Sequence, residues 1–255
     1  MTRVISIVSG KGGVGKTTLS INLAYALAKN FKKRTLLIDG NITTSHIGLS
    51  LGVTKANVML NDMLRNENVS FEPYTYIENF DLLLSAISPR SLENVEMSRL
   101  SSLIEKLSLL GYDFILLDTA PGLGKEAVEA IKASKEVLFI TNPLTPSAID
   151  IIRVSELCSE LMITSLGLVL NMVRRKPYEL SAFEIERFVN VPVIGEIPFD
   201  KSVLIALASK KTFVELFPKS KVSKAINKIC STITGEVFLE EKKGFLERIK
   251  SIFIR

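Results

Sequence analysis

The chain has 255 residues, of which 47% are apolar, and a formal net charge of +5. This length and composition fit one large α/β domain, or at most two small ones, with ample apolar residues for a buried core. The charge is uneven, because residues 242–255 hold five basic side chains and one acidic one, which leaves only +1 for residues 1–241. A nearly neutral body argues against a protein that binds nucleic acid through a broadly basic surface.

Cysteine usage and the start of the chain bear on the compartment. Cys158 and Cys230 are isolated, so the sequence predicts neither a Cys-x-x-Cys motif nor a disulfide framework, and a reducing compartment is the simpler interpretation. Met1 is followed almost at once by an apolar run, which leaves no room for a signal peptide. No apolar run approaches the ~18 residues of a membrane span. We therefore expect a cytoplasmic protein.

Apolar runs alternate with amphipathic stretches along the chain. This pattern predicts repeated βα units, and so an α/β fold with a doubly wound, mainly parallel sheet of the P-loop NTPase type and helices on both faces. We expect strands at 4–8, 35–38, 80–84, 112–118, 137–140, 166–170 and 193–197. We expect helices after residue 18 and at 57–64, 98–110 and 147–161, and a further one that exposes the lysines between 219 and 228.

The most specific motif lies between the first expected strand and the first expected helix. Residues 9–18 read Ser-Gly-Lys-Gly-Gly-Val-Gly-Lys-Thr-Thr and satisfy G-x-x-x-x-G-K-[ST]. Glycines let backbone N–H groups wrap a phosphate, and the helix N-terminus adds a positive dipole. Lys16 is expected to reach the β- and γ-phosphates, and the Thr17 hydroxyl to contact Mg²⁺. The predicted nucleotide-binding residues of this loop are Gly10, Lys11, Gly12, Gly13, Val14, Gly15, Lys16, Thr17 and Thr18.

Lys11 is a second lysine within this loop, and phosphate binding by one chain does not require it. Residues 11–18 match at every position the K-G-G-x-G-K-[ST]-[ST] loop of the MinD/ParA ATPases, so the sequence resembles that family. In the family the extra lysine crosses a dimer interface and contacts the partner subunit's phosphates. The resemblance implies an ATPase that uses ATP and Mg²⁺, forms a homodimer when ATP is bound, and employs Lys11 and Lys16 in catalysis. A solvated loop lysine is the alternative.

Two strand ends carry candidate metal-binding carboxylates. Asp118 closes an apolar strand in a Walker B pattern, and Asp39 ends the strand at 35–38, so both join Thr17 as predicted Mg²⁺ ligands. The resemblance places Asp39 in the family's first switch loop, typically D-x-D, but here the second position is Asn41. The family links that carboxylate to activation of the attacking water. Asn41 can still orient water through its side-chain oxygen, which predicts slow hydrolysis; the alternative is that it only shapes the loop.

The resemblance also places the adenine between two later strand ends. Asn171 would hydrogen-bond the base edge, and residues 198–200 would line the pocket. These are Pro198, Phe199 and Asp200. Ordinary turn chemistry is the alternative for such residues at strand ends.

The end of the chain has a different composition from the body. We divide the chain into an ATPase domain at 1–235, a charged linker at 236–244 and an amphipathic helix at 245–255. A basic amphipathic stretch with aromatic residues is typical of an in-plane membrane anchor on anionic lipid, and it resembles the membrane-targeting helix of MinD-type members. A last helix docked on the domain itself is the alternative. The apolar face comprises Phe245, Leu246, Ile249, Ile252 and Phe253.

The resemblance covers nearly the whole chain and implies an ATPase switch. ATP-dependent dimerisation would drive reversible binding to the inner face of the cell membrane, for division-site placement or positioning of a polar structure, with a protein activator or cargo. The alternatives are a ParA-like partition ATPase that binds DNA, although the neutral body makes nucleic acid an unlikely partner, and a relative that positions flagella or chemotaxis structures. An iron–sulfur carrier of the same fold would need clustered cysteines.

Overall fold

The structure, a computed structural model, describes residues 1–238. They form one eight-stranded sheet in the order β3-β4-β2-β5-β1-β6-β7-β8, in which β3 runs antiparallel to β4 and all other neighbours are parallel. This confirms the predicted doubly wound, mainly parallel sheet. The strands are β1 (Arg3–Val8), β2 (Thr35–Asp39), β3 (Tyr74–Ile77), β4 (Phe80–Leu83), β5 (Phe114–Asp118), β6 (Glu136–Thr141), β7 (Thr164–Val173) and β8 (Val193–Pro198).

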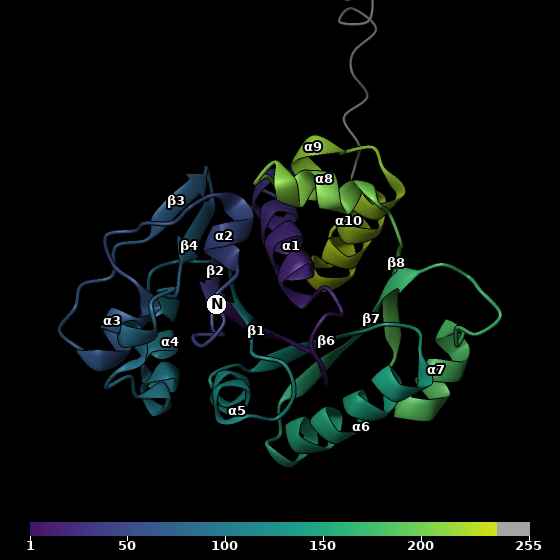
Figure 1. The fold of residues 1–255 in the computed structure, drawn as a ribbon, viewed down its shortest axis with the longest axis horizontal. Helices are drawn as coiled ribbons and strands as arrows, with labels where there is room; N and C mark the ends of the chain where they lie inside the picture. Colours follow the sequence, from purple (N-terminus) through teal and green to yellow (C-terminus); the bar gives the residue numbers. More distant parts are fainter. Residues whose placement is uncertain (239–255) are drawn as a thin grey trace, which may run out of the picture.

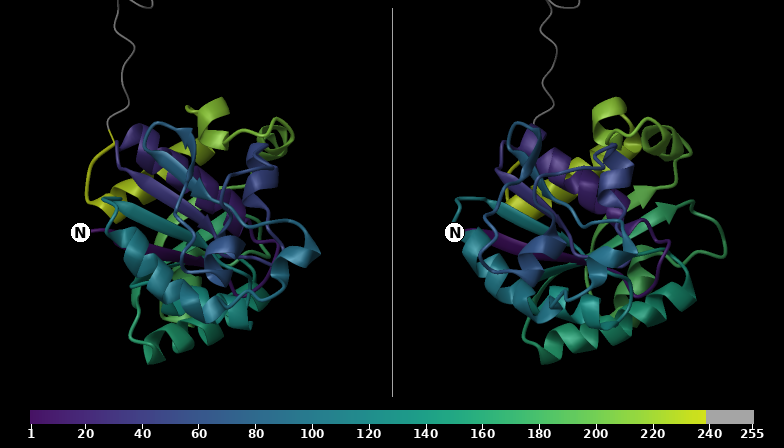
Figure 2. Two further views of the ribbon diagram at one scale, coloured as in Figure 1. Left: turned by 90° about the vertical axis from the view of Figure 1, so that its left-hand side faces the viewer. Right: turned by 60° about the vertical axis from the view of Figure 1, so that its left-hand side comes forward.

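Helices cover both faces of the sheet, as Figures 1 and 2 show. One layer contains α1, α2 and α8 to α10, and the other contains α3 to α7. The helices are α1 (Lys16–Asn30), α2 (Ile47–Leu51), α3 (Leu60–Arg65), α4 (Leu100–Ser108), α5 (Lys125–Lys132), α6 (Thr145–Glu160), α7 (Ala182–Val189), α8 (Ser202–Ala208), α9 (Phe213–Leu216) and α10 (Lys221–Thr234). Two short 3₁₀ helices, Pro89–Leu92 and Met97–Arg99, precede α4.

The central strands are apolar throughout because both of their faces are covered. In β1, Ile5 and Ile7 pack with α1 and α10 on one face, whereas Val4 and Val8 belong to the clusters on the other. The strand's period of two therefore divides one apolar run between two cores. This burial fixes the register that brings the functional strand ends together.

The carboxyl ends of β2, β5 and β1 lie side by side at one edge of the sheet. From β1 the chain crosses to β2 on one side, and from β5 it crosses to β6 on the other, so the direction of winding changes here. Open α/β sheets bind ligands outside the strand ends at such a point. The three ends deliver Ser9, Asp39 and Asp118, with Asp39 and Asp118 directly opposite each other in the ladder.

The described part of the chain ends after α10. Gly235 terminates that helix with a positive φ of 74°. Residues 236–238, which the sequence analysis assigns to the linker, contact the domain: Glu236 pairs with Lys33, and the Phe238 ring centroid lies 5.7 Å from that of Phe31. The rest of the predicted linker and the predicted helix at 245–255 lie outside the described residues. Among residues 1–238, no helix has the length and apolar character needed to cross a membrane.

Candidate nucleotide-binding site

The glycine-rich loop joins β1 to α1 and opens toward the carboxyl edge of the sheet. Gly13 and Gly15 have φ values of 81° and 91°, in the left-handed region that favours glycine. Gly15 precedes the first turn of α1 and provides no side-chain cap, so the helix N–H groups face the cleft unblocked. Loop residues 9 and 11–18 line a cleft of about 310 Å³. Its size, exposed donors and helix dipole suit phosphate groups.

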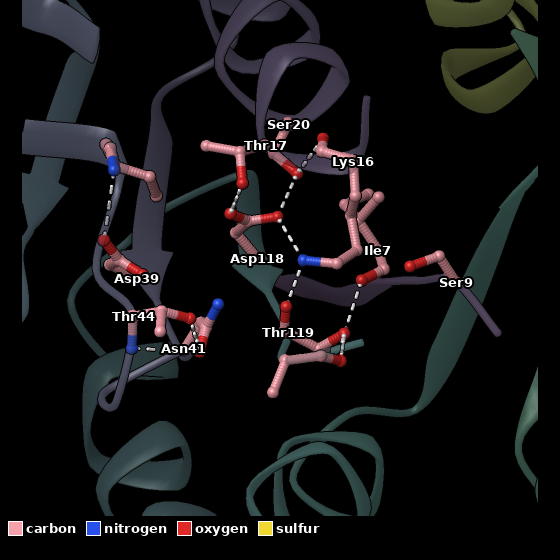
Figure 3. Close-up of polar contacts among 12 residues, drawn as sticks. Ile7, Ser9, Lys16, Thr17, Ser20, Asp39, Asn41, Thr44, Asp118 and Thr119 are labelled. Atoms are coloured by element: carbon pink, nitrogen blue, oxygen red, sulfur yellow. Dashed lines mark hydrogen bonds and ion pairs between the residues drawn. The ribbon is translucent and has the colours of Figure 1, made fainter. Parts of the chain in front are cut away.

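The Asp118 carboxylate contacts three side chains at the base of this cleft (Figure 3). Its Oδ2 accepts a hydrogen bond of 2.6 Å from the Thr17 hydroxyl, and its Oδ1 accepts one of 2.9 Å from Ser20. The Lys16 ammonium lies 3.0 Å from Oδ1 and also donates to the Thr119 carbonyl. Lys16 is buried, so the pair holds its ammonium at the base of the cleft. Sequence reasoning missed Ser20, although it lies one helical turn after Lys16.

Asp39 is the second carboxylate of the site, and its environment is unusual. Its Oδ2 accepts hydrogen bonds from the Ser45 hydroxyl and the Ile47 N–H, whereas its Oδ1 is buried and has no partner within residues 1–238. Burial raises the pKa of Asp39 to about 7, and the negative charge of Asp118 adds to the shift. The Ser45 and Ile47 bonds and the Lys16 charge only partly oppose it.

These observations fit the predicted Mg²⁺ site. An unpartnered buried carboxylate oxygen beside a second carboxylate can accept a cation, and Thr17 adds a hydroxyl oxygen. Magnesium prefers such hard oxygen ligands, usually one or two carboxylates with substrate phosphates. Thr17, Asp39 and Asp118 are therefore the residues that would hold it, and the assignment remains a prediction.

The raised pKa of Asp39 predicts a pH-dependent stability in the absence of Mg²⁺ and nucleotide. Between the ordinary pKa of 3.8 and the folded value of about 7, the folded state keeps a proton that the unfolded state has released. The free energy of unfolding therefore falls as pH rises through this range. Asp39→Asn removes this dependence because an amide does not titrate, and its side-chain oxygen can still accept hydrogen bonds from Ser45 and Ile47.

Urea unfolding at pH 5 and pH 8 measures the effect. Relative to the wild type, the free energy of unfolding of the variant should rise by about 2.7 kcal/mol from pH 5 to pH 8. About two pH units of the titration range lie between these values, at ~1.36 kcal/mol per unit. At pH 8, saturating Mg-ATP should make the wild type more stable than the variant, since only the wild type keeps the Asp39 carboxylate as a third predicted Mg²⁺ ligand. If the difference in the free energy of unfolding between the wild type and the variant were the same at both pH values, the pKa of Asp39 would not be raised in the folded protein.

Asn41 is buried and lies in the loop between Asp39 and α2, residues 40–46, which we call the switch I loop. Its Oδ1 accepts hydrogen bonds from the Thr44 hydroxyl at 3.0 Å and the Thr44 N–H at 3.4 Å (Figure 3). Both lone pairs of that oxygen are thus engaged within the loop. In this conformation Asn41 shapes the loop, which is the alternative that the sequence left open. Asn41 and Thr44 both line the phosphate cleft.

A second, mostly apolar cavity of about 140 Å³ adjoins the glycine-rich loop. It contains the predicted adenine residues 171 and 198–200. The Asn171 amide donates to the Val14 carbonyl at 2.8 Å, so this side chain connects the cavity to the phosphate loop. The Arg174 guanidinium lies over the Phe199 ring, 3.7 Å from its centre. Sequence reasoning missed the opposite wall, which comes from α8 to α10: Val203, Leu204, Phe213, Val222 and Ile226.

The remaining predicted residues divide between the cleft and the undescribed tail. Lys11 lines the phosphate cleft and is only partly buried. Its ammonium takes part in no hydrogen bond or ion pair within residues 1–238. His46 and Pro121 also line the cleft. The predicted membrane residues at 245–253 lie outside the described residues.

Comparisons with known proteins agree with this geometry. The family model described as "ParA: NUBPL iron-transfer P-loop NTPase" matches residues 1–234. The septum site-determining protein MinD of Buchnera aphidicola is 30% identical, over 98% of this chain and 99% of its own length. MinD of Pyrococcus horikoshii, solved with Mg-ADP, has a TM-score of 0.87 and 30% identity, over 94% of this chain and all of that one. The chain belongs to the MinD/ParA family of P-loop ATPases.

An uncharacterised ATP-binding protein of Methanocaldococcus jannaschii is also 30% identical, over 98% of this chain and 97% of its own length. The iron transfer named in the family model's description finds no counterpart in the cysteines. Cys158 and Cys230 are buried in α6 and α10, on opposite faces of the sheet, so they cannot share a cluster. Burial also raises the pKa of both thiols, which disfavours the thiolate that binds metal. The ATPase site is therefore the candidate functional centre of this chain.

Proposed function

We propose that this chain is a MinD-like ATPase switch. ATP binding drives a homodimer, the dimer binds the inner face of the cell membrane, and hydrolysis releases it. The output is spatial: placement of the division site or of another polar structure. The observation that carries this proposal is Lys11, a lysine that lines the phosphate cleft while Lys16 already occupies its base.

The chemistry depends on position and charge. Lys16 binds the β- and γ-phosphates of its own subunit's nucleotide, and the glycine-rich loop holds them through backbone N–H groups. Lys11 reaches the partner subunit's phosphates, so hydrolysis and dimerisation are coupled. Mg²⁺, when bound, neutralises phosphate charge. Asn171 and residues 198–200 hold the adenine.

A protein partner completes the proposed cycle. A MinD protein of Aquifex aeolicus that is 26% identical to this chain was solved in a complex with MinC. We infer that this chain likewise has a protein activator or cargo.

The predicted amphipathic helix at 245–255, which we call the tail, would connect dimerisation to membrane binding. Each large apolar side chain that it buries in lipid contributes roughly 1.5–3 kcal/mol, but a helix shorter than ~12–15 residues is marginal in water and must order on binding. One tail therefore binds weakly. Two tails on one dimer gain roughly 10²–10⁴ in avidity. This is how ATP would control membrane binding.

Co-sedimentation with anionic vesicles tests the proposal. We expect the full chain to sediment with ATP, to remain largely in the supernatant with ADP, and to bind less as salt rises. Ile249→Glu and deletion of 245–255 should each abolish sedimentation, whereas Ser251→Glu, off the apolar face, should weaken it only modestly. Equal sedimentation with ADP and ATP would show that the nucleotide does not control membrane binding, and the proposed switch would be wrong.

A further inference from the structure

The switch I loop is tied to a helix that the proposed function does not use. The Thr43 hydroxyl donates a hydrogen bond to Oε1 of Glu126. Glu126 lies in the first turn of α5, directly after the Gly/Pro loop at 119–124 that follows Asp118. Its other oxygen, Oε2, is buried and finds no hydrogen-bond partner within residues 1–238. The bond to Thr43 is thus the contact that compensates a partly buried carboxylate.

A second contact shows that the loop follows the surface of α5. A Cβ placed on Gly40 would lie 3.8 Å from the Cβ of Ala130 and 3.1 Å from the Asp118 carbonyl oxygen. Ala130 is one helical turn beyond Glu126, so both residues lie on the same face of α5. The switch I loop therefore meets two successive turns of this helix, at Gly40 and at Thr43.

The residues of the switch I loop contact two different parts of the molecule, the phosphate cleft and α5. Asn41 and Thr44 line the phosphate cleft and are joined to each other through the Asn41 side-chain oxygen. Thr43, between them in sequence, bonds to α5 instead. Thr43 and Thr44 are both exposed, so packing alone does not hold this segment. Fixing the backbone of a free loop residue costs conformational entropy, and an anchor behind the loop removes part of that cost.

We propose that Glu126 is a positioning residue for ATP hydrolysis. Its bond to Thr43 holds the switch I loop and the first turn of α5 together as one unit, and so keeps Asn41 and Thr44 in place beside the γ-phosphate. Glu126 acts through Thr43 and does not touch the nucleotide. α5 begins at the end of the loop at 119–124. A shift of that loop before or after ATP hydrolysis would therefore also move the switch I loop. This inference rests on the proposed nucleotide site.

A double-mutant cycle on the single-turnover rate at saturating Mg-ATP tests the proposal. Thr43→Val and Glu126→Ala should each slow hydrolysis roughly tenfold, the range for loss of a hydrogen bond to a charged group. The ATP dissociation constant should change less than about twofold. The double variant should be no slower than the slower single variant, because both remove one interaction. Thr43→Ser and Glu126→Gln keep the donor and the acceptor and should stay close to the wild type.

Glu129→Ala is the matched control on the same helix. Glu129 pairs with Lys132 at 3.0 Å, away from switch I, so this variant should hydrolyse ATP at the wild-type rate. Unchanged rates in Thr43→Val, or effects of the two variants that multiply in the double variant, would overturn the proposal. Lys16→Ala tests the nucleotide site separately, because it should lose activity whether or not Glu126 positions switch I. If Lys16→Ala is inactive but the Thr43 and Glu126 variants hydrolyse ATP at the wild-type rate, the nucleotide site stands and only the positioning role is refuted.

Discussion

Replacing Lys11 with alanine should abolish ATP-dependent dimerisation while leaving the folded monomer intact. The Lys11 ammonium lines the phosphate cleft and is not engaged with any group of residues 1–238. Its loss should therefore change the free energy of unfolding by less than about 0.5 kcal/mol, as for most surface substitutions. A charge supplied across an interface to a transferring phosphoryl group is worth about 10³–10⁵ in rate in other NTPases. We expect hydrolysis to fall at least ~10²-fold.

Lys16→Ala provides the contrast. Lys16 is buried and pairs with Asp118 at 3.0 Å, so its removal leaves an uncompensated carboxylate beside Asp39. Breaking a buried pair in this way costs about 3–5 kcal/mol. This variant should lose stability and ATP affinity together, whereas Lys11→Ala should keep measurable ATP affinity.

Light scattering with ATP, ADP and no nucleotide measures dimerisation, and single-turnover assays measure hydrolysis. Lys29→Ala, an exposed lysine in the last turn of α1, controls for the change in net charge. If Lys11→Ala forms normal dimers with ATP, the lysine does not act on a partner subunit, and the proposed coupling is wrong.

The sequence predicted those parts of the fold that leave a strong local pattern. Both faces of the central strands are buried, so their apolar runs are continuous, and the glycine-rich loop and Asp118 follow them directly. In β7 only the middle is fully buried, and the prediction of 166–170 therefore found about half of Thr164–Val173. The edge strand β3 and the helices α2, α5, α7, α8 and α9 escaped prediction. β3 is largely exposed, and Leu204 and Ile205 of α8 are exposed, so neither element leaves a clear apolar pattern.

Contacts between distant segments left no pattern to read. Asn171, Phe213 and Ile226, which are far apart in the sequence, all line the second, mostly apolar cavity. The hydrogen bond from Thr43 to Glu126 spans 83 positions. Asn41 shows the same limit at a single residue. Its sequence position suggested an oxygen free to orient water, and only the folded loop shows that Thr44 occupies this oxygen.

A single methyl group is expected to have a large effect at Gly10. A Cβ at this position would lie 2.2 Å from the Cβ of Asp150 and 2.6 Å from its carbonyl carbon. These atoms belong to the body of α6, so no flexible side-chain end can move aside. Either α6 or the glycine-rich loop must shift. Gly10→Ala should therefore displace the phosphate-binding N–H groups, lower ATP affinity at least ~10²-fold and cost about 1–3 kcal/mol of stability through overpacking.

Gly12→Ala makes the same change two residues later in the same loop. Its added Cβ would meet only the Pro121 side chain, at 4.0 Å, an ordinary van der Waals distance. We expect this variant to fold and to bind ATP as a monomer with nearly wild-type affinity. Isothermal titration with ATP and thermal unfolding of both variants measure the difference. Because the two changes share loop, charge and residue type, equal losses would mean that the close approach of Gly10 to α6 does not set the shape of the phosphate site. A loss confined to Gly10→Ala would identify α6 as the rigid support against which the loop is held.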